Sequence, residues 1–323
     1  MMHSATMQCL LKVSELGSIR RAAEALNLAS SAVNRRILNL EQDLGVALFK
    51  RTQRGVVPTA AGQLLLRHVR DTLGDYERTL DEIRSETGIL SGEVRIIGIG
   101  SFVDCILPSA IVEFADAHPA MHFRVVHGDI GHVVRELRSG HFDLGITFLD
   151  NRIRELELCA KLDTGVGAIM ASSHPLARRK SVTLTECAAF STSMFSERWI
   201  IEPLVDSEFQ RTGVEFRPRV ITNSMAIMEA AIRARLGIGF FTPIGFIEDI
   251  QKGTIVHVPL EAGDFSPEGI GLFATKPALD SPTLRATIAF LSELFQDLQS
   301  RLDAIKGAGP DKRGQPASVD RAR

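Results

Sequence analysis

The chain has 323 residues, of which 45% are hydrophobic and 24% are charged, and its formal net charge is −2. These values fit a globular protein of two or three domains and exclude a uniformly basic coat for nucleic acid. The charge is unevenly distributed, however. Residues 1–60 carry eight basic and four acidic side chains, whereas residues 91–305 carry twenty and twenty-seven. Positive charge therefore gathers at the N-terminus, where it could neutralise phosphates.

Two short helices are predicted first. Residues 1–6 are expected to be a loose start, and Met7, Leu10 and Val13 then predict a supporting helix that ends near Gly17. An alanine-rich helix follows over residues 20–26, and the pair at 27–28 breaks it before the next helix. Helix, tight turn and helix in this order predict a helix-turn-helix unit.

The next helix has two distinct faces. Its apolar residues are spaced by four, three and four, which predicts one buried stripe: Val33, Ile37, Leu40 and Leu44. Short polar and basic side chains lie opposite this stripe or on its flanks. Arginine can pair with guanine edges, asparagine with adenine edges, and serine with bases or phosphates. The DNA-binding candidates on this helix are Ser30, Ser31, Asn34, Arg35 and Arg36. A helical bundle with a solvated charged face is the alternative.

A basic hairpin is predicted beside that helix. Leu48 and Phe49 lead into a basic run, and a turn at Gly55 precedes the short strand 56–57. Such a wing can follow phosphates or a minor groove. It adds Arg51 and Arg54 to the DNA-binding candidates.

The spacing of these motifs is specific. Over about forty residues, the following positions keep the spacing of one known pattern: Ala22-Ala23, Leu26, Ala32-Val33, Arg35-Arg36, Leu40-Glu41, Leu44-Gly45, Leu48-Phe49, Arg51 and Thr59-x-x-Gly62. This string resembles the N-terminal domain of the LysR-type transcriptional regulators. The chain departs from the family at Ala29-Ser30, where serine and glutamine are usual, and at Asn34, where serine is usual. We expect the helix cap to move to Ser30 and Asn34 to supply a replacement amide.

A long helix opens at Thr59, which is the expected N-cap. Its apolar residues form a heptad seam: Leu66, Val69, Leu73, Tyr76, Leu80 and Ile83. A partner must cover this seam. An intrachain partner remains an alternative, but a second copy of the helix would place two reading heads on one duplex, so we expect a homodimer and a partly two-fold DNA site.

From residue 93 onward, strands alternate with helices. Strands are expected at 94–99, 122–127, 144–148, 168–170, 220–222, 238–241, 255–258 and 271–274, and helices near 106–114, 130–137, 224–235 and 282–305. This order predicts a parallel sheet covered on both faces. His174-Pro175-Leu176-Ala177, and Gly237-Ile238-Gly239 followed by Pro243, resemble the periplasmic-binding-protein-like effector domain of the same regulators.

The expected fold is therefore an all-α winged helix-turn-helix domain, a linker helix, and an α/β effector domain of two lobes. The boundaries are residues 1–58 for DNA binding, 59–90 for the linker and dimerisation helix, and 91–305 for effector binding. The first lobe covers about 91–163 and 266–305, and the second about 164–265. Residues 306–323 lack periodicity and are expected to be a disordered tail.

An effector site is expected in a cleft between the lobes, where strands end and helices begin. The candidates are Gly100, Ser101, Phe102, Thr147, Phe148, Asn223, Ser224 and Thr242. The resemblance implies that the segment around Ser101 holds a ligand carboxylate. Hydroxyls beside phenylalanine rings favour a small organic acid with an apolar part.

Other kinds of chemistry are weakly supported. The segment 98–103 follows a strand as a dinucleotide fingerprint would, but Val103 replaces its third glycine, and neither a phosphate loop nor a nucleophile elbow is present. We therefore expect no catalytic residue, no cofactor and no metal among the scattered histidines. The four cysteines lack C-x-x-C spacing and are expected to be reduced thiols, with an oxidant-sensing pair at Cys159 and Cys187 as the alternative.

The sequence thus predicts a LysR-type, DNA-binding transcriptional regulator controlled by a small-molecule effector. Its expected partners are double-stranded DNA, the effector and further copies of itself, as a homodimer or homotetramer, with RNA polymerase as a further candidate. No signal segment or membrane-spanning run is seen, so a cytoplasmic location is expected. The alternative is an α/β solute-binding or catalytic protein with an incidental helical N-terminus.

Overall fold

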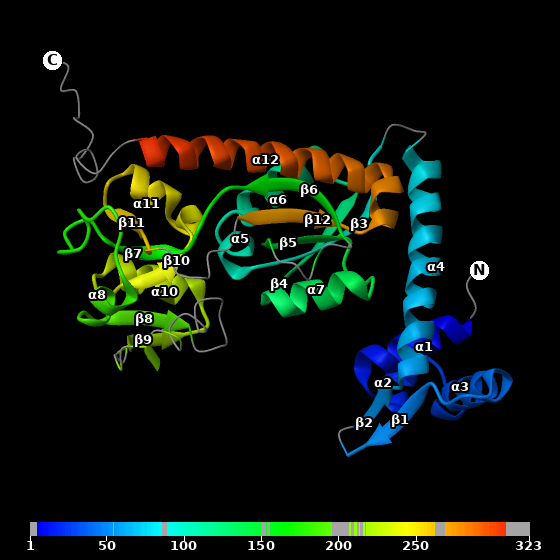
Figure 1. Ribbon diagram of the computed structural model, residues 1–323. Coiled ribbons are helices and arrows are strands. Elements are labelled where there is room, and N and C mark those ends of the chain that lie inside the picture. The colour runs from blue at the N-terminus through cyan, green and yellow to red at the C-terminus, as the bar shows by residue number, and fades with distance from the viewer. Residues whose placement is uncertain are drawn as a thin grey trace. The chain divides into compact units, whose positions relative to one another are not determined.

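The computed structural model (Figure 1) describes residues 5–307 except 54, 86–88, 150–152, 154–155, 196–206, 208–209, 212, 214–215, 217 and 262–268. Its contacts divide the chain into two units: Met1–Thr87 with Ser139–His141, and Gly88–Arg138 with Phe142–Arg323. Arg54 of the expected wing, the end of the second lobe beyond residue 261 and the tail from residue 308 lie outside the described residues. No helix in the described ranges is long and apolar enough to cross a membrane.

The first unit is a winged helix-turn-helix domain, as the sequence predicts. Its elements are α1 (Ala5–Leu16), α2 (Ile19–Ala25), α3 (Ser30–Leu44), β1 (Phe49–Thr52), β2 (Gly55–Pro58) and the long α4 (Ala60–Ser85). Gly17 and Gly45 adopt positive φ angles of 62° and 65°, which end α1 and α3. The Ser18 hydroxyl caps α2 by accepting a hydrogen bond from the Arg21 backbone nitrogen.

The start of α3 differs from expectation. Ala29, not Ser30, occupies the N-cap position, with extended backbone angles and no side-chain hydrogen bond, and Ser30 is already helical. The absence of a hydroxyl at position 29 therefore leaves this helix without a side-chain cap, because the backbone geometry of the turn sets where the helix begins. The buried stripe of α3 is also shorter than predicted. Val33 and Ile37 are buried, but Leu44 is 51% exposed at the helix end, beyond the domain core.

The linker helix α4 begins as predicted. The Thr59 hydroxyl accepts a hydrogen bond from the Gly62 backbone nitrogen at 3.0 Å. The first part of the heptad seam, however, is covered within the chain. Leu66 and Val69 are buried in the core of the winged helix domain, and Leu73 packs against that core. The expectation that a second copy covers the whole seam was therefore wrong for this part of α4. Near the other end of the seam, Ile83 is 61% exposed, so the chain itself leaves that side chain uncovered.

The second unit contains a five-stranded sheet in the order β4-β3-β5-β12-β6. Its strands are β3 (Gly92–Gly98), β4 (Met121–His127), β5 (Leu144–Phe148), β6 (Glu157–Leu162) and β12 (Ile270–Ala274), and its helices are α5 (Gly100–Val103), α6 (Leu107–Ala117), α7 (Ile130–Arg138) and α12 (Pro282–Gly307). We call this group the first lobe. The expected all-parallel sheet was wrong: β3, β4 and β5 are parallel, but β12 runs antiparallel to β5 and β6. Helices α7 and α12 cover opposite faces (Figure 1).

The 3-10 helix η3 (Lys276–Asp280) joins β12 to α12 in the first lobe, and we call the remaining elements of this unit the second lobe. They are β7 (Gly167–Ala171), α8 (Leu184–Ala188), β8 (Thr192–Phe195), β9 (Pro218–Thr222), α10 (Met225–Arg233), β10 (Gly239–Phe241), the 3-10 helix η2 (Pro243–Phe246), α11 (Ile247–Gln251) and β11 (Ile255–Pro259). Strand β7 lies between β10 and β11, antiparallel to both. Strands β8 and β9 form a parallel pair, and Thr192 of β8 bridges to Ile238 just before β10. The sequence patterns had missed β6 in the first lobe and α8, β8 and α11 in the second, all of which are six residues long or shorter.

Candidate functional site

Helix α3 presents the expected polar face. Ser30, Ser31 and Arg35 are exposed, Asn34 is half-buried on the flank, and Leu38 is 52% exposed. Val33 and Ile37 bury the opposite side in the domain core. The buried side fixes the helix, so its exposed side is a stable surface that could enter a DNA groove.

Arg36 is less exposed than the neighbouring Arg35 and contacts another helix of the same domain. Its guanidinium Nη1 lies 3.7 Å from the Cys9 sulfur on α1, and the side chain is half-buried. The structure therefore gives Arg36 an intramolecular contact that the helical periodicity alone did not indicate. Arg35 is the arginine of this pair that lies on the exposed face.

The wing is held to the helices by several backbone contacts. Strands β1 and β2 pair antiparallel from Phe49 with Pro58 to Thr52 with Gly55, and Lys50 and Arg51 are exposed on β1. The backbone nitrogen of Val56 donates to the Gly17 carbonyl oxygen at 2.9 Å. This bond ties the returning strand to the turn after α1, so the basic side chains of β1 project from a fixed hairpin.

In the second unit, two effector candidates have unusual surroundings. Thr147, near the end of β5, and Thr242, directly after β10, are buried, and neither hydroxyl has a hydrogen-bond partner in the described part of the chain. Thr192 and Ser193 of β8 share this property, and sequence analysis missed both. The run of hydroxyl residues at 191–193 was the available signal. Ser193 lies beside the strand that leads to Thr242, because its backbone nitrogen donates to the Ile238 carbonyl oxygen at 2.8 Å.

The candidates around α5 differ in character. Gly100 begins α5, and the next residue, Ser101, is 3% exposed. Phe102 is fully buried, with its ring centroid 5.0 Å from that of Phe295 on α12. Phe148 also packs in the core of the first lobe, on the face of β5 opposite to Thr147, because consecutive strand residues point to opposite faces. Both rings are therefore engaged in core packing.

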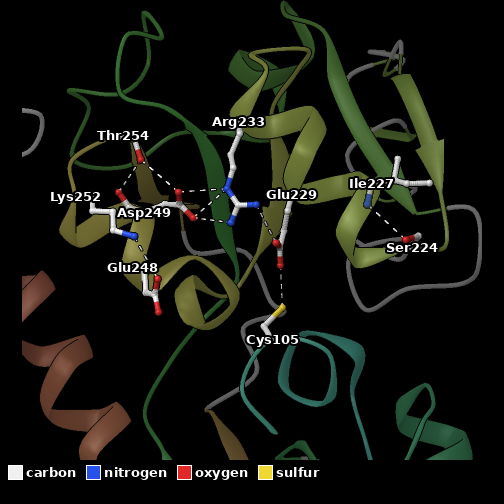
Figure 2. A network of polar contacts seen from close by, with 9 residues as sticks. All are labelled: Cys105, Ser224, Ile227, Glu229, Arg233, Glu248, Asp249, Lys252 and Thr254. Carbon is white, nitrogen blue, oxygen red and sulfur yellow. Dashed lines mark hydrogen bonds and ion pairs between the residues drawn. The ribbon is translucent and has the colours of Figure 1, made fainter. Parts of the chain in front are cut away.

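Asn223 and Ser224 precede α10. Asn223 is exposed. The Ser224 hydroxyl caps the helix by accepting a hydrogen bond from the Ile227 backbone nitrogen at 3.5 Å (Figure 2). The Ser224 backbone nitrogen in turn donates to the Thr222 hydroxyl at 3.0 Å. The start of α10 is thus fixed by two local contacts.

Cys159 and Cys187 do not have the environment of reactive thiols. Burial, followed by the charge of Glu186, raises the pKa of Cys187 to about 12. Burial, followed by the charge of Glu157, also raises the pKa of Cys159. Because the thiolate is the reactive form, these shifts oppose the oxidant-sensing alternative for this pair. No group of three or more His, Cys, Asp or Glu side chains within the described ranges could hold a metal ion.

Comparison with known proteins covers both units. Residues 5–63 match the family model described as "Bacterial regulatory helix-turn-helix protein, lysR family", and residues 87–296 match the "LysR substrate binding domain". The chain is 30% identical over 258 residues to the regulator CbbR of Sinorhizobium medicae, covering 76% of this chain and 78% of that protein. It is 25% identical over 301 residues to the uncharacterized regulator YbhD of Escherichia coli, covering 92% and 93%.

Similarity to solved structures agrees with these matches. ArgP from Mycobacterium tuberculosis superimposes with a TM-score of 0.63 at 24% identity, covering 93% of this chain and 98% of that one, which shows a shared fold. The match at residues 5–63 also rules out an incidental helical N-terminus. The curated relatives are named as transcriptional regulators and not as enzymes. The chain belongs to the LysR family and is a transcriptional regulator with a helix-turn-helix DNA-binding domain and a substrate-binding domain.

Proposed function

We propose that this LysR-type regulator binds promoter DNA through the exposed face of α3 and its wing, and that a small organic acid bound in the second unit changes that binding. The observation that carries the effector part is a set of buried hydroxyls that have no hydrogen-bond partner among the residues the structure describes, at Thr147, Ser193 and Thr242. The observation that carries the DNA part is the exposed Ser30, Ser31 and Arg35 on a helix whose other side is buried.

Buried hydroxyls without partners favour a ligand for an energetic reason. A polar group that is buried and unsatisfied costs about 1–3 kcal/mol, so proteins rarely retain several without a purpose. A carboxylate offers up to four acceptor sites, and hydroxyls can donate to them. We place the effector among Ser101, Thr147, Ser193, Ser224 and Thr242, with Gly100 and Asn223 at its edge. Phe102 and Phe148 would shape the site from the core side.

The division of the chain follows the same proposal. Residues 1–58 read DNA, 59–90 link and dimerise, and 91–305 bind the effector. Lys306 and Gly307, which the sequence analysis placed in a tail, instead end α12. In the effector-binding part, about 91–163 and 266–305 form one lobe and about 164–265 the other. Two copies would pair through the later part of α4, where Ile83 is exposed, and would present two α3 helices to one duplex. A tetramer and a contact with RNA polymerase are further parts of this proposal, as is a cytoplasmic location.

The effector would control DNA binding by having different affinities for two arrangements of the dimer. An effector that binds one arrangement of the dimer more tightly than another shifts the population towards it. If the two arrangements space the reading heads differently, DNA affinity changes by the same coupling free energy.

The DNA part can be tested by a gel shift on DNA upstream of the protein's own gene and its neighbours. Arg35→Ala should weaken specific binding by about ten- to a hundredfold, which corresponds to about 1–3 kcal/mol. Arg219→Ala, which removes the same charge from the exposed surface of β9, is the matched control and should bind as the wild type does. Unchanged binding by Arg35→Ala would contradict the assignment of α3.

The effector part can be tested by a thermal-shift screen of small carboxylic acids. A true effector stabilises the folded protein by mass action, and Ser101→Ala should reduce that shift. Undiminished affinity in Ser101→Ala would contradict the proposed site.

A further inference from the structure

The two lobes of the second unit are joined by a polar contact at Cys105. This cysteine lies between α5 and α6 of the first lobe, and its sulfur is 3.0 Å from Glu229 Oε1 on α10 of the second lobe. Figure 2 shows the two side chains pointing toward each other. The contact joins residues that are 124 positions apart in the sequence, so neither local structure nor chain connectivity requires it.

The carboxylate of Glu229 is held from its other side. Arg233, one turn further along α10, donates from Nη1 to Glu229 Oε2 at 3.1 Å. The same guanidinium donates to Asp249 of α11 through Nη2 at 2.8 Å and Nε at 3.2 Å (Figure 2). The Thr254 hydroxyl donates to the Asp249 carbonyl oxygen at 3.1 Å. These contacts fix Glu229 in the orientation that meets Cys105.

The Cys105 thiol is the donor of this hydrogen bond. Burial, followed by the hydrogen bond and the charge of Glu229, raises the pKa of the Cys105 thiol far above its usual value. The thiol therefore keeps its proton and donates, and the Glu229 carboxylate accepts. A hydrogen bond to an ionised acceptor is stronger than one between neutral groups.

Apolar packing surrounds this bond. A Cβ placed on Gly245 of η2 would lie 3.2 Å from the Cys105 sulfur, so η2 passes close to the cysteine. Ile244 and Ile247 of the second lobe belong to the hydrophobic core of the first lobe. The packing brings the lobes together there, and the hydrogen bond adds a polar contact between α10 and the first lobe.

We propose that the hydrogen bond from Cys105 to Glu229 is an inter-lobe latch that holds α10 in place against the first lobe. Helix α10 carries Glu229 near its middle and is capped by Ser224 at its start. Ser224, a candidate effector residue, lies at the start of the same helix, so loss of the bond weakens the hold of the first lobe on the helix that carries it. The link to effector binding rests on the proposed function, whereas the latch itself does not.

Hydrogen–deuterium exchange on the full-length, ligand-free protein tests the latch. Cys105→Ala should accelerate amide exchange in α10 by about tenfold, because the helix loses a hydrogen bond between a thiol and a charged group. Cys105→Ser, which retains a donor, should restore most of the protection. Cys159→Ala is the matched control, because Cys159 lies on β6 with contacts to Glu157 of its own strand and to Ala274 of β12, and it should leave α10 unchanged.

A second measurement separates a hydrogen bond from simple packing. Alkylation of Cys105 by iodoacetamide should be faster in Glu229→Gln than in the wild type, because the charge that raises the thiol pKa is removed. Equal exchange in Cys105→Ala and the wild type, or equal effects of alanine and serine, would overturn the latch. Both readouts are taken without effector or DNA, so failure of the latch leaves the Arg35 gel shift as a separate test of the proposed function.

Discussion

Glu41 Oε1 lies 2.7 Å from the backbone nitrogen of Leu48, and the same oxygen accepts from the backbone nitrogen of Phe49 at 3.0 Å. The carboxylate of this α3 residue thereby holds the first residues of the wing. Leucine and glutamate at 40–41 are part of the family pattern, and the structure supplies a physical reason for the glutamate.

We expect Glu41→Ala to destabilise the DNA-binding domain by about 2 kcal/mol, since two backbone donors lose a charged acceptor. Urea unfolding followed by circular dichroism would measure this. Glu41→Gln retains an acceptor oxygen and should lose about half as much. Glu24→Ala, at an exposed position on α2, is the control and should stay within 0.5 kcal/mol of the wild type, as is usual for surface changes. Equal losses in all three variants would refute this role.

Gly62→Ala should also destabilise the domain, although alanine is the better helix former. A Cβ at position 62 would overlap the carbonyl oxygen of Leu48, which is backbone and cannot move aside easily. We expect a net loss of about 1–3 kcal/mol, typical of overpacking, in place of the roughly 1 kcal/mol gain that helix propensity alone predicts. Gln63→Ala, exposed on the same helix, provides the comparison. Thermal unfolding that shows Gly62→Ala more stable than the wild type would contradict the close approach.

Replacing a buried hydroxyl that has no partner among the described residues should raise the stability of the folded protein instead of lowering it. Thr147→Val and Thr242→Val each remove a buried hydroxyl without a partner in the described chain, so we expect roughly 1 kcal/mol of added stability without ligand. The same variants should lose the thermal shift given by any acid that the screen identifies. Thr222→Val is the matched control, because its hydroxyl accepts from the Ser224 backbone nitrogen and its removal should destabilise the protein. Destabilisation of Thr147→Val and Thr242→Val to the same degree would refute this interpretation of the two hydroxyls.

The Arg95–Asp143 pair should dominate the ion pairs of the first lobe. Arg95 Nη2 lies 2.7 Å from Asp143 Oδ1 and Nε lies 3.0 Å from Oδ2, and the two side chains are only 28% and 12% exposed. Arg95→Met would leave the carboxylate half-satisfied, at an expected cost of about 3 kcal/mol. Arg124→Met breaks the exposed pair with Glu93 and should cost at most about 1 kcal/mol. Calorimetry of both variants measures how much stability each loses. Equal losses would show that burial does not strengthen the Arg95–Asp143 pair.

His174 should make stability depend on pH. Burial lowers its pKa in the folded protein below the usual 6.5, and its Nδ1 accepts from the Leu176 backbone nitrogen at 3.2 Å. Below pH 6.5 the unfolded chain therefore binds a proton that the folded chain does not, so this contribution is present above the unfolded pKa and is lost as the pH falls towards the folded pKa. Melting temperatures from pH 7.5 to 5 should fall less steeply in His174→Gln. If the melting temperature falls equally steeply with pH in the wild type and in His174→Gln, the lowered pKa of His174 would be contradicted.

Local patterns predicted much of the DNA-binding domain and the ends of many helices. The cap at Thr59 and the two faces of α3 follow from side-chain chemistry within a few residues, because capping and helical periodicity act at short range. The family match also depends on this segment, where spacing and residue type can be read together.

Tertiary structure decided what local patterns leave open. A heptad seam has the same spacing whether its partner is another copy or the chain itself, and only the fold shows Leu66 and Val69 in the domain's own core. Strand patterns do not encode direction, so the antiparallel β12 could not be predicted. The buried hydroxyls and the contact of Cys105 with Glu229 depend on residues far apart in sequence, and the amino-acid order alone carries no distance between them.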